Sequence, residues 1–292
     1  MNRVSILNCH EIGCPDVLLK VYEELCTAFN ELGYSVETIH SIQSIQSNSI
    51  VFLGNTIRCN NPAELLLAQS PTSVYFGWYW QDIDTSSLPN FINIYENMKN
   101  PTDYVVRNYS KPNHCPLLLR ASEHPDKIAT YPRTDEITYF FSGWKIQEHL
   151  IPTRYSGVYN GITDSSKYLS YDERRNFYLK SIFALGLQSD ENVQSQHVSQ
   201  RIYEGMAYGC IVITNSKPAV VQTNGIAVYA NTVCDIEAQM EYYLTHPIER
   251  LQKQVDGYKF VKEQGTNRTA LQVLLNARNN CLRDMKIVKV KC

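Results

Sequence analysis

Short apolar runs alternate along this chain with segments of helical periodicity, and this alternation limits the possible folds more than any other feature. Val4–Leu7 is an apolar run, apolar residues then recur at helical spacing over Val17–Leu32, and strand character returns at Ser35–Ile39. Such a strand–helix–strand unit has the length of a parallel crossover. The run Ile50–Leu53 continues the pattern. We therefore predict an open α/β sheet in an N-terminal domain over residues 1–130.

The same pattern starts again after a polar segment. His124–Asp135 contains two prolines and is predicted to be a linker. Ile137–Phe141 is then a strand that runs directly into a glycine loop, and strand and helix signals continue to residue 270. We predict a second Rossmann-like α/β domain over 137–270 and a helix and tail over 271–292. A length of 292 residues suits two domains.

Charge and cysteine usage exclude several classes of function. The net charge is −2 and no long basic run occurs, so the sequence has no electrostatic signature of nucleic-acid binding. No stretch approaches the ~20 apolar residues that a membrane span needs, and the first residues do not resemble a signal peptide. The nine cysteines form no C-x-x-C pair, which favours a reducing cytoplasm over a disulfide framework or a zinc site.

The segment from Ser199 to Gly209 carries the clearest chemistry. The sequence predicts a helix capped by Ser199 and followed at once by the buried strand Cys210–Thr214. The first turn of a helix exposes unpaired N–H groups and the positive end of its dipole, where a phosphate binds readily. Arg201 would add a guanidinium suited to phosphate oxygens, and Glu204 a carboxylate suited to a ribose diol. A plain amphipathic helix, with both charges in water, remains an open alternative.

The string Val198–Ser216 resembles the donor-binding motif of GT-B glycosyltransferases, in particular the exostosin-like and group-1 families. These enzymes carry a Ser-x-Arg-x-x-Glu helix, then Gly-Cys-Ile and a strand. Tyr139–Gly143 is similar to the opening strand and glycine loop of their second domain. The resemblance implies two Rossmann-like domains with a cleft between them and a C-terminal helix that returns to the first domain. It also implies sugar transfer from a nucleoside diphosphate sugar to a glycan hydroxyl.

The resemblance also implies how the donor is held. Glu204 would bind the ribose, and the diphosphate would lie against the helix tip, the glycine loop and nearby cations, represented here by Ser199, Arg201, Gly143, Lys145 and Arg154. No cofactor other than the donor and no metal is expected. The exostosin-like families suggest a UDP-sugar such as UDP-xylose.

One departure from the family pattern affects the expected stereochemistry. Retaining group-1 enzymes carry a second glutamate eight residues before the position of Glu204, where this chain has Gln196. Its absence favours inversion, which requires a general base for the acceptor hydroxyl. Loops that follow predicted strands of the N-terminal domain offer Asp82, Glu11 and His10 for this role.

Three other functions are compatible with these residues. Asp82-Ile-Asp84 follows an apolar strand and could hold a divalent cation in a single-domain, metal-dependent GT-A glycosyltransferase. A nucleotide-sugar epimerase can share the two-domain architecture, as can a non-catalytic protein that binds nucleotide sugars.

Overall fold

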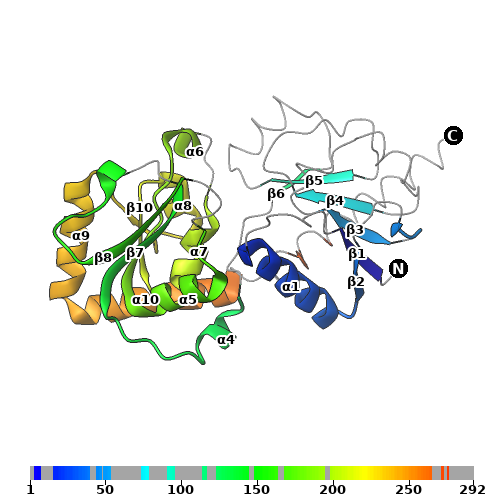
Figure 1. Cartoon of the computed structure of the whole chain (residues 1–292), viewed down its shortest axis with the longest axis horizontal. Helices are drawn as coiled ribbons and strands as arrows, with labels where there is room; N and C mark the ends of the chain where they lie inside the picture. The colour runs from blue at the N-terminus through cyan, green and yellow to red at the C-terminus, as the bar shows by residue number, and fades with distance from the viewer. Residues whose placement is uncertain are drawn as a thin grey trace. The chain divides into compact units, whose positions relative to one another are not determined.

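The computed structural model describes residues 3–7, 16–39, 44–47, 49–53, 74–78, 91–95, 114–116, 123–144, 148–163, 168–194, 198–264, 271–272 and 275. The chain divides into two compact α/β units (Figure 1). The first unit comprises Met1–Cys14, Tyr22–Leu118 and Arg268–Cys292, and the second comprises Pro15–Val21 and Leu119–Asn267. Both ends of the chain belong to the first unit, as expected if the C-terminal segment returns to the first domain.

The first unit is built on a parallel sheet in the order β2-β1-β3-β4-β5-β6. Its strands are β1 (Arg3–Leu7), β2 (Ser35–Ile39), β3 (Ile50–Leu53), β4 (Val74–Trp78), β5 (Phe91–Tyr95) and β6 (His114–Pro116). Helix α1 (Asp16–Glu31) connects β1 to β2, which confirms the predicted crossover. Gly33 follows α1 with a φ of 83°, and the N–H groups of Gly33 and Tyr34 bond back to the last turn. This Schellman arrangement ends the helix where the sequence predicts.

The second unit contains a parallel sheet in the order β11-β10-β9-β7-β8, with helices on both sides (Figure 1). The strands are β7 (Ile137–Trp144), β8 (Gly157–Ile162), β9 (Ser181–Leu185), β10 (Ile211–Thr214) and β11 (Val228–Tyr229). The helices are α4 (Pro125–Ile128), α5 (Tyr171–Lys180), α6 (Asp190–Gln194), α7 (Gln200–Ala207), α8 (Lys217–Gln222), α9 (Val233–Thr245) and α10 (Pro247–Gln264), with the 3₁₀ turn η2 at Glu148–Leu150. No helix within the described ranges is long and apolar enough to cross a membrane.

Both sheets share one topology, which fixes where a ligand can bind. In each, the second strand lies outside the first, and the third strand lies on the first strand's other side. The direction of winding therefore reverses between β1 and β3 and again between β7 and β9. In doubly wound sheets, ligands bind beyond the carboxyl ends of the strands at such switch points. For the second unit, this places the expected site where β7 and β9 end.

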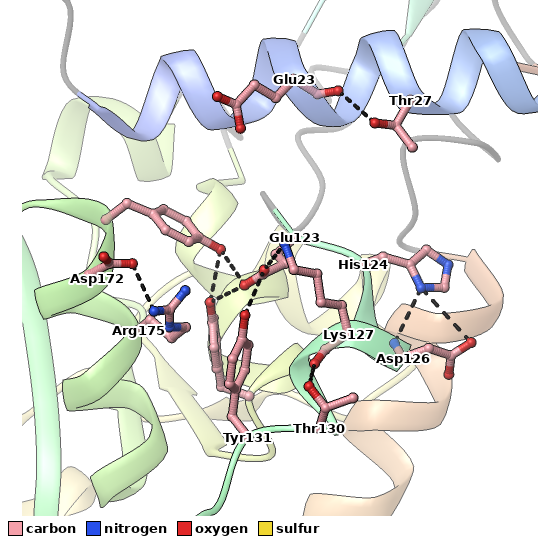
Figure 2. A network of polar contacts seen from close by, with 12 residues as sticks. Glu23, Thr27, Glu123, His124, Asp126, Lys127, Thr130, Tyr131, Asp172 and Arg175 are labelled. Carbon is pink, nitrogen blue, oxygen red and sulfur yellow. Dashed lines mark hydrogen bonds and ion pairs between the residues drawn. The ribbon is translucent and has the colours of Figure 1, made fainter.

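The segment predicted as a linker is folded into the second unit (Figure 2). Glu123, which is 1% exposed, is the centre of a polar network. Its Oε1 accepts from Lys127 Nζ at 2.8 Å and from the Tyr131 hydroxyl at 3.4 Å. Its Oε2 accepts from the hydroxyls of Tyr171 at 2.9 Å and Tyr208 at 3.3 Å. The start of this segment is thus bonded to α5 and to the residue that caps α7.

Two further residues attach the same segment to the unit's core. Asp126, in α4, pairs with Lys262 of α10 at 2.6 Å. Arg133 donates from Nη1 to the carbonyl oxygen of Tyr208 at 2.6 Å and from Nη2 to the carbonyl oxygen of Ser181 at the start of β9. Residues 123–136 therefore act as a structural part of the second unit, in place of the expected linker.

The buried carboxylate of Glu123 predicts a pH-dependent stability. Burial alone would raise the pKa of Glu123, but hydrogen bonds from Lys127 and Tyr171 outweigh it and hold the pKa below its ordinary value. The stabilisation is therefore present above the unfolded-state pKa of about 4.3 and is lost as the pH falls through the lower folded-state value. Glu123→Gln is expected to lower the free energy of unfolding at pH 7 by about 1–3 kcal/mol.

Urea denaturation between pH 3 and 7 measures this effect. The difference between Glu123→Gln and the wild type should shrink toward the acid end. As a control, Glu136→Gln removes an exposed ion pair with Lys180 and should cost about 1 kcal/mol or less at pH 7. A Glu123→Gln variant as stable as the wild type at pH 7 would show that the network contributes little.

Candidate active site

Helix α7 begins and ends as the sequence predicts. Ser199 occupies the N-cap position with extended backbone angles (φ −68°, ψ 143°), although its side chain makes no capping hydrogen bond. Gly209 follows the helix with a φ of 75°. The N–H groups of Gly209 and Cys210 bond to the carbonyl oxygens of Met206 and Gly205 at 2.9 and 2.8 Å, a Schellman motif. The helix is therefore held firmly at its C-terminal end, while the Ser199 hydroxyl is not used for capping.

Helix α7 lies directly on the sheet. All six residues from Ile202 to Ala207 are buried. A Cβ on Gly205 would lie 2.7 Å from Ala184 Cβ in β9 and 2.8 Å from a Val212 methyl carbon in β10, so only glycine permits this approach. The amphipathic surface helix considered above is therefore excluded, because the side that would carry Glu204 is enclosed.

Arg201 lies at the switch point of the second sheet. Its Nη1 donates to the carbonyl oxygen of Leu187, just after β9, at 2.9 Å. A Cβ on Gly143, near the end of β7, would lie only 2.6 Å from the same nitrogen. The guanidinium carbon is 5.2 Å from the centroid of the Phe141 ring. The structure therefore brings two of the predicted site residues, Gly143 and Arg201, together where β7 and β9 end.

The charge of Arg201 has no direct counter-ion within the part of the chain that the structure describes. Loss of hydration lowers the pKa of its guanidinium from the ordinary value, and nearby Arg174 lowers it further, while Tyr178 and Glu204 oppose this shift without cancelling it. No carboxylate of the described residues forms an ion pair with the Arg201 guanidinium. Its Nη1 donates instead to the neutral carbonyl oxygen of Leu187. A cation that has lost hydration without gaining a carboxylate partner favours an incoming anion.

The Glu204 carboxylate is buried and contacts two other side chains of the second unit. It is 2% exposed. Arg174 Nη2, from α5, lies 3.2 Å from its Oε1 and 3.4 Å from its Oε2, and Gln200 donates to Oε1 at 3.3 Å. Arg174 is therefore the cation that pairs directly with Glu204, whereas Arg201 forms no ion pair with a carboxylate of the described residues. Arg174 was not predicted from the sequence, because it lies thirty residues before Glu204 and looks like one of several solvated charges.

Arg154 lies elsewhere in the second unit. It precedes β8 by three residues, and β8 begins opposite Tyr139, near the amino end of β7. Its guanidinium pairs with Glu241 of α9 at 3.0 Å, and its backbone N–H donates to Glu237. The structure does not bring Arg154 to the carboxyl end of β7, where Gly143 and Arg201 meet.

The remaining predicted site residues, Lys145, His10, Glu11, Asp82 and Asp84, lie outside the described residues, as does Gln196. Strands β1 and β4 end at Leu7 and Trp78, so His10, Glu11 and Asp82 follow the carboxyl ends of these strands in the chain.

Comparison with known proteins agrees with this geometry. Residues 136–276 match a family model described as glycosyl transferase-like. This part of the chain is therefore similar to the glycosyl transferases of that family. No curated protein matches the chain by sequence.

Solved structures of glycosyltransferases share the fold of the whole chain. An α-glucosyltransferase in complex with UDP and a 13-mer DNA superposes with a TM-score of 0.59 at 12% identity, covering 95% of this chain and 99% of that one. OtsA in its apo form gives 0.57 at 10% identity, covering 88% and 77%. An α1,3-fucosyltransferase with GDP-fucose gives 0.52 at 10% identity, covering 94% and 90%.

The chain thus has the GT-B fold of these structures, and its residues 136–276 are similar to glycosyl transferases. Its two separate parallel sheets overturn the single-domain GT-A alternative.

The pairing of Arg174 with Glu204 predicts a large and specific loss of stability. Arg174→Met would leave the buried Glu204 carboxylate without its cation, which typically costs about 3–5 kcal/mol. The neighbouring Arg175→Met removes a cation whose partner, Asp172, is mostly exposed, and should cost about 1 kcal/mol or less. Chemical denaturation of the two variants measures the difference. Equal losses of unfolding free energy in the two variants would indicate that the buried Arg174–Glu204 pair stabilises the protein no more than an exposed ion pair does.

Proposed function

We propose that the chain is a glycosyltransferase that binds a nucleoside diphosphate sugar in its second unit, over 137–270, and transfers the sugar to a hydroxyl group of an acceptor held by residues 1–130. The observation that carries this proposal is the position of Arg201. A half-buried cation that pairs with no carboxylate of the described residues lies in the first turn of α7, at the edge where a doubly wound sheet binds its ligand. A diphosphate supplies the negative charge that this edge lacks.

The same groups can stabilise the departing diphosphate. Negative charge grows on the leaving group as the glycosidic bond of the donor breaks. The exposed N–H groups of the α7 N-terminus, the Arg201 guanidinium and the Ser199 hydroxyl are fixed before the reaction and need no reorganisation. These charges serve the purpose that a divalent cation serves in other transferases, and Lys145 adds to them by family resemblance. We therefore propose a reaction that needs neither metal nor cofactor.

Glu204 is the proposed ligand of the ribose. A carboxylate has about four acceptor positions, which suits it to a vicinal diol. Arg174 and Gln200 contact the Glu204 carboxylate at 3.2–3.4 Å and orient it. In this proposal, Arg174 acts as a positioning residue for Glu204.

Transfer with inversion is proposed because Gln196 stands where retaining group-1 enzymes carry a second glutamate. A base at the carboxyl end of a strand in the first unit would then take the acceptor proton, and Asp82, Glu11 and His10 are the candidates. The solved neighbours bind UDP or GDP-fucose, which supports a UDP- or GDP-sugar as donor, UDP-xylose among them. One neighbour holds DNA, but a net charge of −2 favours a glycan acceptor here.

Arg201→Met tests the donor site. A ligand that binds the native state raises its melting temperature. UDP, GDP and their sugar conjugates are screened in EDTA, and at least one is expected to stabilise the wild type. Losing a charge-assisted contact of about 1.5–3 kcal/mol should weaken its binding by roughly 10- to 150-fold in Arg201→Met. Arg154→Met, a cation removed at the other end of the strands, is the matched control and should bind as the wild type does. An equal loss in both variants would contradict the proposed position.

Product analysis tests the chemistry. With the best-binding donor and a panel of oligosaccharide acceptors, proton NMR of the first product should show the anomeric configuration opposite to that of the donor. Retention would contradict the role given to Gln196. Conversion of the donor to an isomeric nucleotide sugar without any acceptor would indicate an epimerase. Tight binding without turnover of any pair would indicate a binding protein.

A further inference from the structure

Gln188 has a buried side chain whose amide forms no hydrogen bond within the described part of the chain. It follows β9 by three residues and is 3% exposed. Among the residues that the structure describes, neither its Nε2 nor its Oε1 has a hydrogen-bond partner, and both atoms are enclosed. An unsatisfied buried amide is costly, and native proteins contain few of them without a reason.

Both main-chain polar groups of Gln188, in contrast, form hydrogen bonds. Its N–H donates to Asn215 Oδ1 at 2.9 Å, and its carbonyl oxygen accepts from Asn215 Nδ2 at 2.9 Å. Thr214 Oγ1 donates to the carbonyl oxygen of Gly186 at 2.8 Å, which ties the same loop to the end of β10. The main-chain N–H and carbonyl oxygen at this position are therefore both hydrogen-bonded, while the buried side-chain amide has no partner among the described residues. Such support is typical of a residue positioned for a ligand.

Gln188 is also next to the proposed diphosphate site. Leu187, whose carbonyl oxygen accepts from Arg201, is its immediate neighbour in the chain. In a nucleotide sugar the diphosphate joins two hydroxyl-bearing groups, the ribose and the transferred sugar. With the ribose assigned to Glu204, the group left beside Gln188 is the sugar. An amide both donates and accepts, and so do the hydroxyls of a sugar ring.

We propose that the side-chain amide of Gln188 binds a hydroxyl pair of the transferred sugar and contributes to donor selectivity; this rests on the proposed function. The sugar provides the missing partners of Nε2 and Oε1. Because both atoms are enclosed, neighbouring side chains must move as the sugar enters.

The inference predicts opposite effects of one substitution on stability and on binding. Gln188→Leu removes an unsatisfied amide at similar volume, so the melting temperature without ligand should stay the same or rise. Affinity for the nucleotide sugar should fall by about tenfold, the worth of roughly one to two neutral hydrogen bonds. Affinity for the bare diphosphate should change by less than about twofold. UDP-glucose and UDP-xylose are each measured against UDP, and GDP-fucose against GDP, by calorimetry.

Gln222→Leu is the matched control. Gln222, in α8, also has an Nε2 with no hydrogen-bond partner among the described residues. Its Oε1, however, accepts from the hydroxyl of Tyr203 in α7 at 3.2 Å. Its substitution should leave sugar binding unchanged.

Each other outcome overturns a stated part of the account. A Gln188→Leu variant that binds both ligands as the wild type does would show that the amide does not contact the donor. Equal losses for the sugar conjugate and the bare diphosphate would assign Gln188 to the nucleotide and contradict the sugar contact. If the wild type bound none of these ligands, the proposed function itself would fail, and this inference with it.

Discussion

The second unit depends on the way one guanidinium is held at the edge of its sheet. Arg201 reaches from the first turn of α7 to the carbonyl oxygen after β9 and fits only because Gly143 has no side chain. The contact joins the two strands between which the winding of the sheet reverses. A half-buried cation of this kind, which has lost part of its hydration, favours an accompanying anion. The fold therefore keeps a positive charge at the edge of the sheet where we propose that a diphosphate binds.

The ion pair between Arg174 and Glu204 explains how α7 can place a buried carboxylate against the sheet. Arg174 neutralises Glu204 from α5, and Gly205 lets the helix backbone rest on β9 and β10. The last residue of the helix, Tyr208, shares Glu123 with Tyr171, so the C-terminal end of α7 is bonded to the segment that enters the unit. One end of the helix is thus fixed by structural contacts, while the other end faces the proposed ligand.

Elements with strong local signals were predictable from the sequence. Helix α1 and helix α7 have apolar periodicity or capping residues, and both end at a glycine with positive φ. Strand β8 was missed because Gly157–Ile162 contains two glycines and an asparagine, and only pairing with β7 orders it. Strand β5 was also missed. The partner of Glu204 and the unsatisfied amide of Gln188 depend on contacts between distant segments, for which one sequence without tertiary information gives no signal.

A crystal structure of the chain with its best-binding nucleotide sugar tests the central claim most directly. The account predicts that the phosphate nearest the sugar lies within hydrogen-bond distance of Arg201 and of the N–H groups that begin α7. A diphosphate bound far from residues 199–204, with Arg201 still bonded only to the carbonyl oxygen of Leu187, would contradict it.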